Sequence, residues 1–479
     1  MTEVKIQTAP FDARFPNVNQ TKRCWQSYFD YTKCTAAKGE DYPPCKQFLR
    51  TYMTVCPNEW IERWDAQKEE GTYPGALVLE RAGQAPVRVE TPSYVKYTRR
   101  GLQPHLLPDV AAGLGAQPAA TRVQLEDFLD KDSSHRGRFG GGLREFAALG
   151  RADIAILDVL DPTTTARTAK AEAKAMVIDG AGGTRRLSPE LFAELADALK
   201  PDVVVPPADY IEEPLPSLEH GKRIQKSAAR SARWLDECLA RIAHPAAVFA
   251  PVMGSHCPTQ RTMYATMLAA RKDVAGYSFN DISLALPFGR KLELAQRSLA
   301  ILDPALPRYM AGASAPDAAL QAVLGGIDLV DSSYPYAVTE QGFASTYALS
   351  SDGGASGHLD MWQDAMRADF GPLVDGCSCP TCARHHRAYI HHLLLTKEML
   401  ATVLLQVHNL HVYQRFFADI RASLARDTLR ADAERFLRHY GCDGPEPAAA
   451  FGELRLLATQ LATPTTKIQR QRHAEQPSG

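Results

Sequence analysis

The sequence predicts an α/β fold in which a TIM-like (β/α)8 barrel carries a helical, cysteine-rich subdomain and follows a small all-α hairpin. Short apolar or β-branched runs alternate with helical stretches over about 280 residues, a pattern typical of such barrels. Four cysteines cluster in the first 60 residues, and three more lie between positions 377 and 382. The chain has 479 residues, more than one ordinary domain contains, so two or more domains are expected.

The overall composition is that of a globular protein. Apolar residues make up 45% of the chain and charged residues 23%. The net charge of −1 and the pI of about 6.9 argue against general nucleic-acid binding, although a local basic patch is compatible with a neutral total. No apolar run is long enough to span a membrane. Met1 to Pro10 form neither a signal core nor an Arg-rich presequence.

Residues 1–78 are predicted to form a hairpin of two helices. Nine residues separate Cys24 from Cys34, ten separate Cys45 from Cys56, and a loop with Gly and Pro lies between the pairs. Antiparallel helices would place Cys24 opposite Cys56 and Cys34 opposite Cys45, and only this pairing suits a hairpin. A reduced hairpin or a zinc site is the alternative, but these spacings are long for zinc. Apolar residues at helical spacing are Trp25, Tyr28 and Phe29, then Phe48, Leu49, Tyr52 and Met53.

This segment resembles cytochrome c oxidase subunit VIb. The residues that carry the resemblance are Ala9-Pro10-Phe11-Asp12-Ala13-Arg14-Phe15-Pro16-Asn17, Asn19-Gln20-Thr21, Cys24-Trp25-Gln26, Cys56-Pro57, Trp60, Trp64-Asp65 and Glu70-Gly71-Thr72-Tyr73-Pro74-Gly75. The resemblance implies a coiled coil-helix-coiled coil-helix (CHCH) module on the intermembrane-space face of the oxidase, with oxidase subunits as partners. Such modules are imported without a cleaved presequence and are oxidised in that compartment.

A barrel is expected over residues 91–465, after a junction without periodicity at 79–90 and before a disordered tail at 466–479. Ser188 and Pro189 are expected to cap and begin a helix. A doubly wound sheet is the alternative, but no glycine-rich nucleotide motif favours it. The expected strands are Ile154–Leu157, Val203–Val205, Ala246–Val252, Gly276–Phe279, Arg308–Met310 and Ile327–Val330, and the expected helices include Arg230–Ile242 and Ala315–Leu324.

A metal site is predicted at Cys377, Cys379 and Cys382. Their C-x-C-x2-C spacing, with Gly, Ser and Pro between them, lets three sulfurs converge, and a fourth ligand would complete a tetrahedral zinc site. Spacing alone does not identify the fourth ligand. The candidates are His385, His386, His391, His392 and His408.

The same region resembles the zinc subdomain of the tRNA-guanine transglycosylases. The cysteine motif is followed by R-A-Y-I-H-H-L at Arg387–Leu393 and by His408-Asn409. The resemblance implies His408 as the fourth ligand and one structural Zn²⁺, in a subdomain of about residues 371–425. R-S-A-R-W-L at Arg230–Leu235 and G-I-D-L-V-D at Gly326–Asp331 extend the resemblance to about residues 90–440.

The resemblance implies a barrel that exchanges a purine on tRNA, but several catalytic motifs are altered. Asp331 stands at the position of the carboxylate nucleophile, yet the following Ser332–Gly342 resembles accessory subunits instead of catalytic ones. A barrel-end aspartate bonded to loop amides is therefore the expected role. With these segments altered, the hydrogen-bonding edge of the purine has too few hydrogen-bond partners. The other altered segments are Leu160-Asp161-Pro162-Thr163-Thr164-Thr165, Val252-Met253-Gly254 and Asn280-Asp281-Ile282-Ser283-Leu284.

These features predict a non-catalytic subunit of the queuine tRNA-ribosyltransferase, forming a heterodimer with a catalytic homologue through apolar-rich helices within residues 388–425. The complex would exchange guanine for queuine at the wobble position of tRNA. One alternative is a structural subunit of mitochondrial cytochrome c oxidase carrying a barrel passenger. Another is a self-sufficient transglycosylase that uses Asp331.

The two resemblances imply different compartments. The barrel is expected in the cytoplasm or on the outer surface of the mitochondrion, whereas the oxidised hairpin is expected in the intermembrane space. If the chain is a true fusion, its two units are therefore expected in different compartments. If two neighbouring genes have instead been joined mistakenly in the gene model, this conflict does not arise.

Overall fold

The computed structural model contains two compact units, Met1–Thr72 and Tyr73–Gly479, and each is described here by itself. Among the residues that the structure describes, no helix is long and apolar enough to cross a membrane. The described residues are 23–24, 27–28, 30–31, 34–35, 42–58, 61, 75–81, 86–114, 119–129, 141–161, 172–180, 183–211, 220–281, 287–349, 357–440 and 466–468.

Two disulfides hold the N-terminal unit. Cys24 is joined to Cys56 and Cys34 to Cys45, with Cα atoms 5.0 Å and 5.5 Å apart. This is the pairing that an antiparallel hairpin predicts. Most residues that carry the oxidase resemblance, including residues 9–21, lie outside the described part of the chain.

Helix α2, Pro43–Val55, is the longest described element of this unit. Its prolines lie in the first turn, where a missing amide hydrogen costs no helical bond. Tyr52 is buried and packs edge-on against Tyr28, with ring centroids 5.1 Å apart. Met53, which was expected on the same face, is exposed, so the core of this unit is narrower than the sequence pattern indicates.

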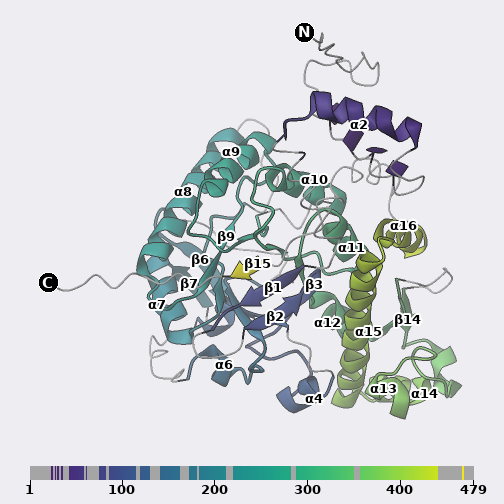
Figure 1. The fold of residues 1–479 in the computed structure, drawn as a ribbon. Helices are drawn as coiled ribbons and strands as arrows, with labels where there is room; N and C mark the ends of the chain where they lie inside the picture. The colour runs from purple at the N-terminus through teal and green to yellow at the C-terminus, as the bar shows by residue number, and fades with distance from the viewer. Residues whose placement is uncertain are drawn as a thin grey trace, which may run out of the picture. The chain divides into compact units, whose positions relative to one another are not determined.

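Eight parallel strands close into a barrel in the second unit, which confirms the predicted architecture (Figure 1). Each barrel strand pairs with the next one in the sequence, and the last pairs with the first. The strands are β3 Ser93–Lys96, β4 Ala120–Gln124, β5 Ile154–Asp158, β8 Val203–Val204, β9 Ala247–Pro251, β10 Gly276–Ser278, β11 Arg308–Met310 and β12 Leu329–Asp331. The first two were absent from the expected strands.

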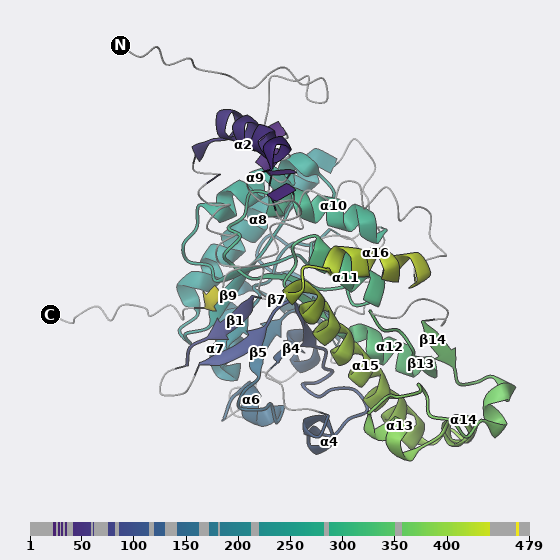
Figure 2. The ribbon, with the colours of Figure 1, turned by 45° about the vertical axis from the view of Figure 1, so that its right-hand side comes forward.

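Helices surround the barrel strands, as Figures 1 and 2 show. The cap expected at Ser188 is present, because its Oγ accepts a hydrogen bond from the amide of Leu191 at 3.2 Å, and Pro189 opens the helix. The outer elements are α4 Pro108–Ala112, the 3-10 helix η1 Leu125–Phe128, α6 Leu143–Phe146, α7 Pro189–Leu199, α8 His220–Arg241, α9 Pro258–Ala269, α10 Phe288–Leu299, α11 Pro316–Leu324 and α12 Ser333–Glu340. A hairpin of β6, Met176–Gly180, and β7, Gly183–Leu187, precedes α7.

Both ends of the expected junction at 79–90 belong to paired strands instead. Strands β1, Ala76–Leu79, and β2, Val87–Glu90, pair antiparallel. Their apolar side chains share one buried cluster with barrel residues such as Phe249 and Leu329, so the hairpin adds to the barrel core. Strand β2 buries Val87 and Val89 and exposes Arg88 and Glu90. This alternation is too short to be recognised in the sequence. The prediction of a disordered tail is wrong at Thr466–Ile468, because these residues form β15 and pair with β1.

A third hairpin, four α-helices and one 3-10 helix form the cysteine-rich subdomain and the segment after it. The hairpin comprises β13, Phe343–Ser345, and β14, His358–Asp360. The predicted helical region 388–425 is divided at Lys397, which has a φ of 56°. The remaining elements are the 3-10 helix η2 Asp364–Ala368, α13 Pro380–Arg384, α14 Arg387–Leu395, α15 Met399–Ala425 and α16 Leu429–Tyr440.

Candidate functional site

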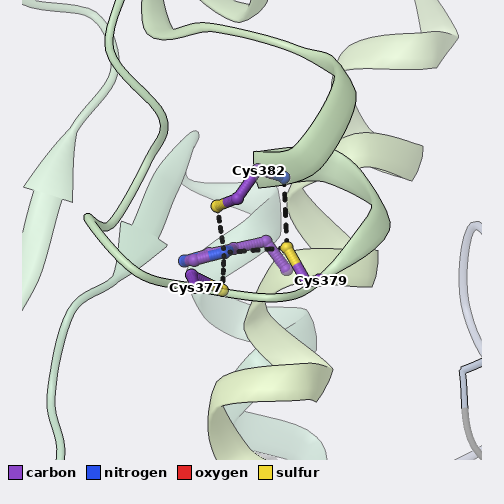
Figure 3. A group of neighbouring side chains, drawn as sticks. Cys377, Cys379 and Cys382 are labelled. Carbon is purple, nitrogen blue, oxygen red and sulfur yellow. Dashed lines mark hydrogen bonds between the residues drawn. The ribbon is translucent and has the colours of Figure 1, made fainter.

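Four side chains form a cluster that could hold a metal ion. They are Cys377, Cys379, Cys382 and His408, and their ligand atoms all lie within 4.8 Å of one another. Figure 3 shows the three cysteine side chains converging, Cys377 and Cys379 from the turn before α13 and Cys382 from the helix itself. His408 reaches them from the middle of α15, with its Nδ1 at 3.8 Å, 3.4 Å and 3.3 Å from the three sulfurs in chain order.

The local sequence builds the turn that gathers the sulfurs. Gly376 adopts a φ of 72°, a conformation that glycine reaches without steric cost. Cys379 occupies the N-cap of α13, where its sulfur accepts a hydrogen bond from the amide of Cys382 at 3.2 Å. Pro380 starts the helix. The same residues that turn the chain therefore aim the thiols at one point.

The partners of the histidine ring fix which nitrogen faces the cysteines. His408 donates from Nε2 to the carbonyl oxygen of Ser345 at 2.9 Å, so Nδ1 remains available as a ligand. The neighbouring Asn409 is fully buried and accepts from the amide of Ser345 at 2.8 Å. Its amide group donates to Thr339 Oγ1 at 2.9 Å and to the carbonyl of Phe343 at 3.1 Å. The His-Asn pair thus ties α15 to β13 and α12.

The donor set and its spacing fit a tetrahedral metal. Bond lengths typical of zinc, 2.3 Å to sulfur and about 2.0 Å to nitrogen, place tetrahedral ligand atoms about 3.5 Å apart, which matches the sulfur–nitrogen distances. The other candidate histidines have different roles. His385 stacks on Tyr389, His386 caps α14, His391 contacts the carbonyl of Met361 at 2.8 Å, and His392 is exposed.

Asp331 ends β12 and is completely buried, with 0% of its surface exposed. One carboxylate oxygen accepts from the amide of Gly312, and the other accepts from Ser333 through its amide, at 3.0 Å, and its hydroxyl. The backbone carbonyl of Asp331 also accepts from the hydroxyl of Tyr413 at 3.1 Å. Both oxygens are therefore engaged by loop groups, as expected for a barrel-end aspartate.

A second buried group at the mouth of the barrel was missed by sequence reasoning. Arg122, on β4, forms an ion pair with Asp158, on β5, at 2.8 Å, and both side chains are 2% exposed. Asn280 donates to the same carboxylate at 3.0 Å. The guanidinium also lies 5.9 Å from the ring centroid of Tyr309. An arginine inside an otherwise buried strand is the one sequence signal that could have drawn attention to this network.

The other altered motifs are placed only in part. Met253 is buried in the main hydrophobic cluster, so it offers no hydrogen bond to a base. Asp281 accepts from the amide of Ser255 at 2.5 Å, and burial raises its pKa to about 6. Asp161 accepts from the hydroxyl of Tyr97 at 2.8 Å. The remaining motif positions, 162–165 and 282–284, lie outside the described residues.

The R-S-A-R-W motif anchors α8 to the residue Asp209 that follows β8. Arg230 and Arg223 pair with the Asp209 carboxylate, which is 0% exposed, at 2.5 Å and 2.6 Å. The hydroxyl of Ser231 accepts from the Asp209 amide at 2.9 Å, and Trp234 is buried. The motif therefore has a structural explanation that needs no substrate.

Each unit is similar to known proteins. Residues 77–441 match the family model described as queuine tRNA-ribosyltransferase, and residues 13–74 match cytochrome oxidase c subunit VIb. Proteins named queuine tRNA-ribosyltransferase accessory subunit 2 are similar to the chain. That of Culex quinquefasciatus is 31% identical, covering 71% of this chain and 82% of the relative. That of Xenopus tropicalis is 30% identical, covering 72% and 92%, and that of Danio rerio is 29% identical, covering 75% and 95%. The chain therefore belongs to the queuine tRNA-ribosyltransferase family.

Proposed function

We propose that the chain is the non-catalytic subunit of a queuine tRNA-ribosyltransferase and pairs with a catalytic homologue that exchanges guanine for queuine in tRNA. The observation that carries this proposal is the environment of Asp331. A carboxylate nucleophile must approach the anomeric carbon of the ribose with a free lone pair. Here hydrogen bonds from Gly312 and Ser333 take three of the roughly four lone-pair sites of the carboxylate, and the side chain is inaccessible to solvent.

The Arg122–Asp158 pair supports the same function. A base that used the Asp158 carboxylate at the end of β5 would have to draw it away from Arg122, and leaving one buried charge unpaired costs roughly 3–5 kcal/mol. Met253 offers no compensating hydrogen bond, because its side chain is apolar and buried. Purine binding that breaks this pair is therefore disfavoured.

We infer that the metal is one structural Zn²⁺ held by Cys377, Cys379, Cys382 and His408. Thiolates and imidazole are the ligands that zinc takes in structural sites, and four protein ligands leave no open position for a substrate. When bound, zinc supplies no chemistry to base exchange. Its effect is to lock the turn before α13 against α15 and so to shape the surface of the subdomain.

That surface is the proposed interface with the catalytic homologue. Exposed apolar side chains gather around α14 and the start of α15, where Met399 is 84% exposed, Phe370 74% and Leu395 58%. Surface patches of this kind mark protein interfaces in soluble proteins. The relatives are named accessory subunits, which supports a partner that carries the activity.

Incorporation of labelled guanine into tRNA tests the function. The chain alone should give no exchange, and the chain mixed with a catalytic homologue should form a heterodimer that does. The double variant Leu395→Glu and Met399→Glu should prevent heterodimer formation, whereas Met263→Glu, at a methionine on α9 that is about as exposed as Leu395, should not. Exchange by this chain alone that is abolished by Asp331→Asn would refute the proposal and make the chain an enzyme.

The N-terminal unit supports a second, mitochondrial role. Its two disulfides need an oxidising compartment to form, and its match to oxidase subunit VIb implies oxidase subunits as partners. Antibodies to each end of the chain test whether one protein carries both units. One shared band near 52.6 kDa, followed through mitochondrial fractionation, would support a true fusion. Two separate bands would show that the units are separate proteins.

A further inference from the structure

We propose that the outer face of the first turns of α8 binds the phosphate backbone of tRNA, an inference that rests on the proposed function. This part of the helix is strongly basic, although the whole chain is neutral. Residues 220–233 carry lysine or arginine at five positions and no acidic residue. The five are Lys222, Arg223, Lys226, Arg230 and Arg233.

The five basic residues divide into two faces. Arg223 and Arg230 turn toward the barrel and are neutralised by Asp209. Lys222, Lys226 and Arg233 are exposed, and their spacing of four and seven residues places them along one side of the helix. With a rise of 1.5 Å per residue, they follow one another at about 6 Å and about 10 Å along the axis. They form a row of cations instead of a single point charge.

Few acidic groups offset this row among the described residues. Glu237 pairs with Arg233 at 3.6 Å, whereas no ion pair between residues that the structure describes, which exclude 212–219, involves Lys222 or Lys226. The row extends to the neighbouring segment, because Arg233 donates to the carbonyl of Ala173, next to the exposed Lys174. Glu172, in the same segment, is already paired with Arg186 at 3.0 Å.

The row of cations lies on a helix that is fixed to the barrel, near the barrel mouth. Asp209 fixes the first turns of α8 through Arg223, Arg230 and the hydroxyls of Ser227 and Ser231, so binding would cost little ordering of the backbone. Because α8 follows β8 and runs back along the barrel, its first turns lie at the mouth end of the barrel. Among possible anionic partners, RNA suits this face better than a membrane. Gln225 and Ala229 separate the cations, and a helix that lies on lipid needs large apolar side chains there.

The test uses full-length chain assembled with a catalytic homologue. The variant Lys222→Gln and Lys226→Gln removes two charges from the row, and Arg241→Gln with Lys272→Gln removes two exposed charges elsewhere as a matched control. The affinity for a tRNA substrate is measured from 50 to 300 mM salt, in roughly the range over which phosphate contacts are lost. The first variant should bind about tenfold more weakly at the lowest salt. Its slope of log affinity against log salt should fall by about 1.5, because each lost phosphate contact removes 0.7–0.9.

The outcomes separate this inference from the proposed function. If the heterodimer does not form or does not exchange base, the proposed function fails. If the heterodimer exchanges base and both variants bind tRNA with the wild-type affinity and slope, the α8 face is not an RNA contact. Vesicles of phosphatidylcholine with phosphatidylserine provide a further arm. Vesicle binding that is lost in the first variant, with tRNA affinity unchanged, would assign the face to a membrane and overturn the inference.

Discussion

The imidazole of His408 donates a hydrogen bond from Nε2 to the carbonyl oxygen of Ser345 at 2.9 Å. This bond joins the metal cluster to β13 and sets the ring so that Nδ1 faces three sulfurs. One histidine therefore serves two functions: it supplies a ligand atom and positions the hairpin beside the subdomain.

His408→Ala should remove bound zinc and lower the thermal stability of the subdomain. Three cysteines alone leave the tetrahedral site incomplete, and metal binding to such a site contributes folding free energy. Metal content of the purified protein measures the first effect and thermal unfolding the second. His392→Ala changes an exposed histidine of α14 and should retain one zinc per chain. Full zinc content in His408→Ala would show that another residue completes the site.

Asn409→Ala should destabilise the second unit by about 2–4 kcal/mol, because it leaves several buried polar groups without partners. The orphaned groups are the amide of Ser345 and the carbonyl of Phe343, while the hydroxyl of Thr339 loses one of its two bonds and keeps its bond to the carbonyl of Pro335. Denaturant unfolding measures the loss. Thr402→Ala, on the same helix, should change stability by less than about 0.5 kcal/mol. Equal stabilities for the two variants would contradict the role assigned to Asn409.

Asp331→Asn should leave base exchange by the heterodimer within about twofold of wild type. Removal of a covalent nucleophile from a catalytic subunit costs several orders of magnitude, whereas this carboxylate only accepts hydrogen bonds. The amide can still accept one hydrogen bond from Ser333. The measurement is the initial rate of guanine incorporation at saturating tRNA. A loss above a hundredfold, with the heterodimer intact, would place Asp331 in the chemistry.

Glu126→Gln should remove a pH dependence of stability between about pH 4.5 and 7. Burial raises the pKa of Glu126 to about 7, while an unfolded glutamate titrates near 4.3. Above pH 4.3 the unfolded chain loses this proton first, so the wild type is progressively destabilised until about pH 7. Glutamine stays neutral and can still accept from the amide of Asp161, which lies 2.7 Å from the carboxylate oxygen. The variant should therefore match the wild type at pH 4 and exceed it by about 1–2 kcal/mol at pH 8, a value reduced for partial exposure. Equal unfolding free energies at pH 8 would contradict the shift.

Replacement of Cys34 and Cys45 by alanine should destabilise the N-terminal unit by about 2–4 kcal/mol, because a unit of this size buries little apolar surface. The second unit should unfold as in the wild type, and calorimetry of the full chain would separate the two transitions. Peptide mapping of the oxidised wild type should give Cys24 linked to Cys56 and Cys34 linked to Cys45. A link between Cys24 and Cys34 would contradict the antiparallel hairpin.

Much of this molecule could be predicted because its signals are local. The spacing of Cys377, Cys379 and Cys382 specifies a turn that gathers thiols, and Ser188-Pro189 specifies the start of a helix. Strands such as Ala247–Pro251 are apolar on both faces, so they stand out as buried runs.

The missed features depend on partners that are distant in sequence. Strand β4 carries Arg122 and Gln124, which look exposed in isolation but are buried, where Arg122 pairs with Asp158 and Gln124 donates to the carbonyl of Thr98. The same holds for Asp209, whose arginine partners lie 14 and 21 residues further along the chain. The polarity of neighbouring residues in the sequence does not indicate whether a charged side chain is buried and paired with a distant one.

The hairpin of β1 and β2 determines where the two parts of this chain can be separated. The match to the oxidase subunit ends at residue 74 and the match to the tRNA-ribosyltransferases begins at residue 77. Ala76–Leu79 are buried against Val87–Glu90 and the barrel, so a barrel cut at residue 79 or 91 would expose the apolar cluster that this hairpin covers. A recombinant barrel therefore needs to begin by residue 75. Likewise, only residue 75 lies between the end of the oxidase match and the start of β1, so a boundary between the two parts that leaves both intact has to fall there.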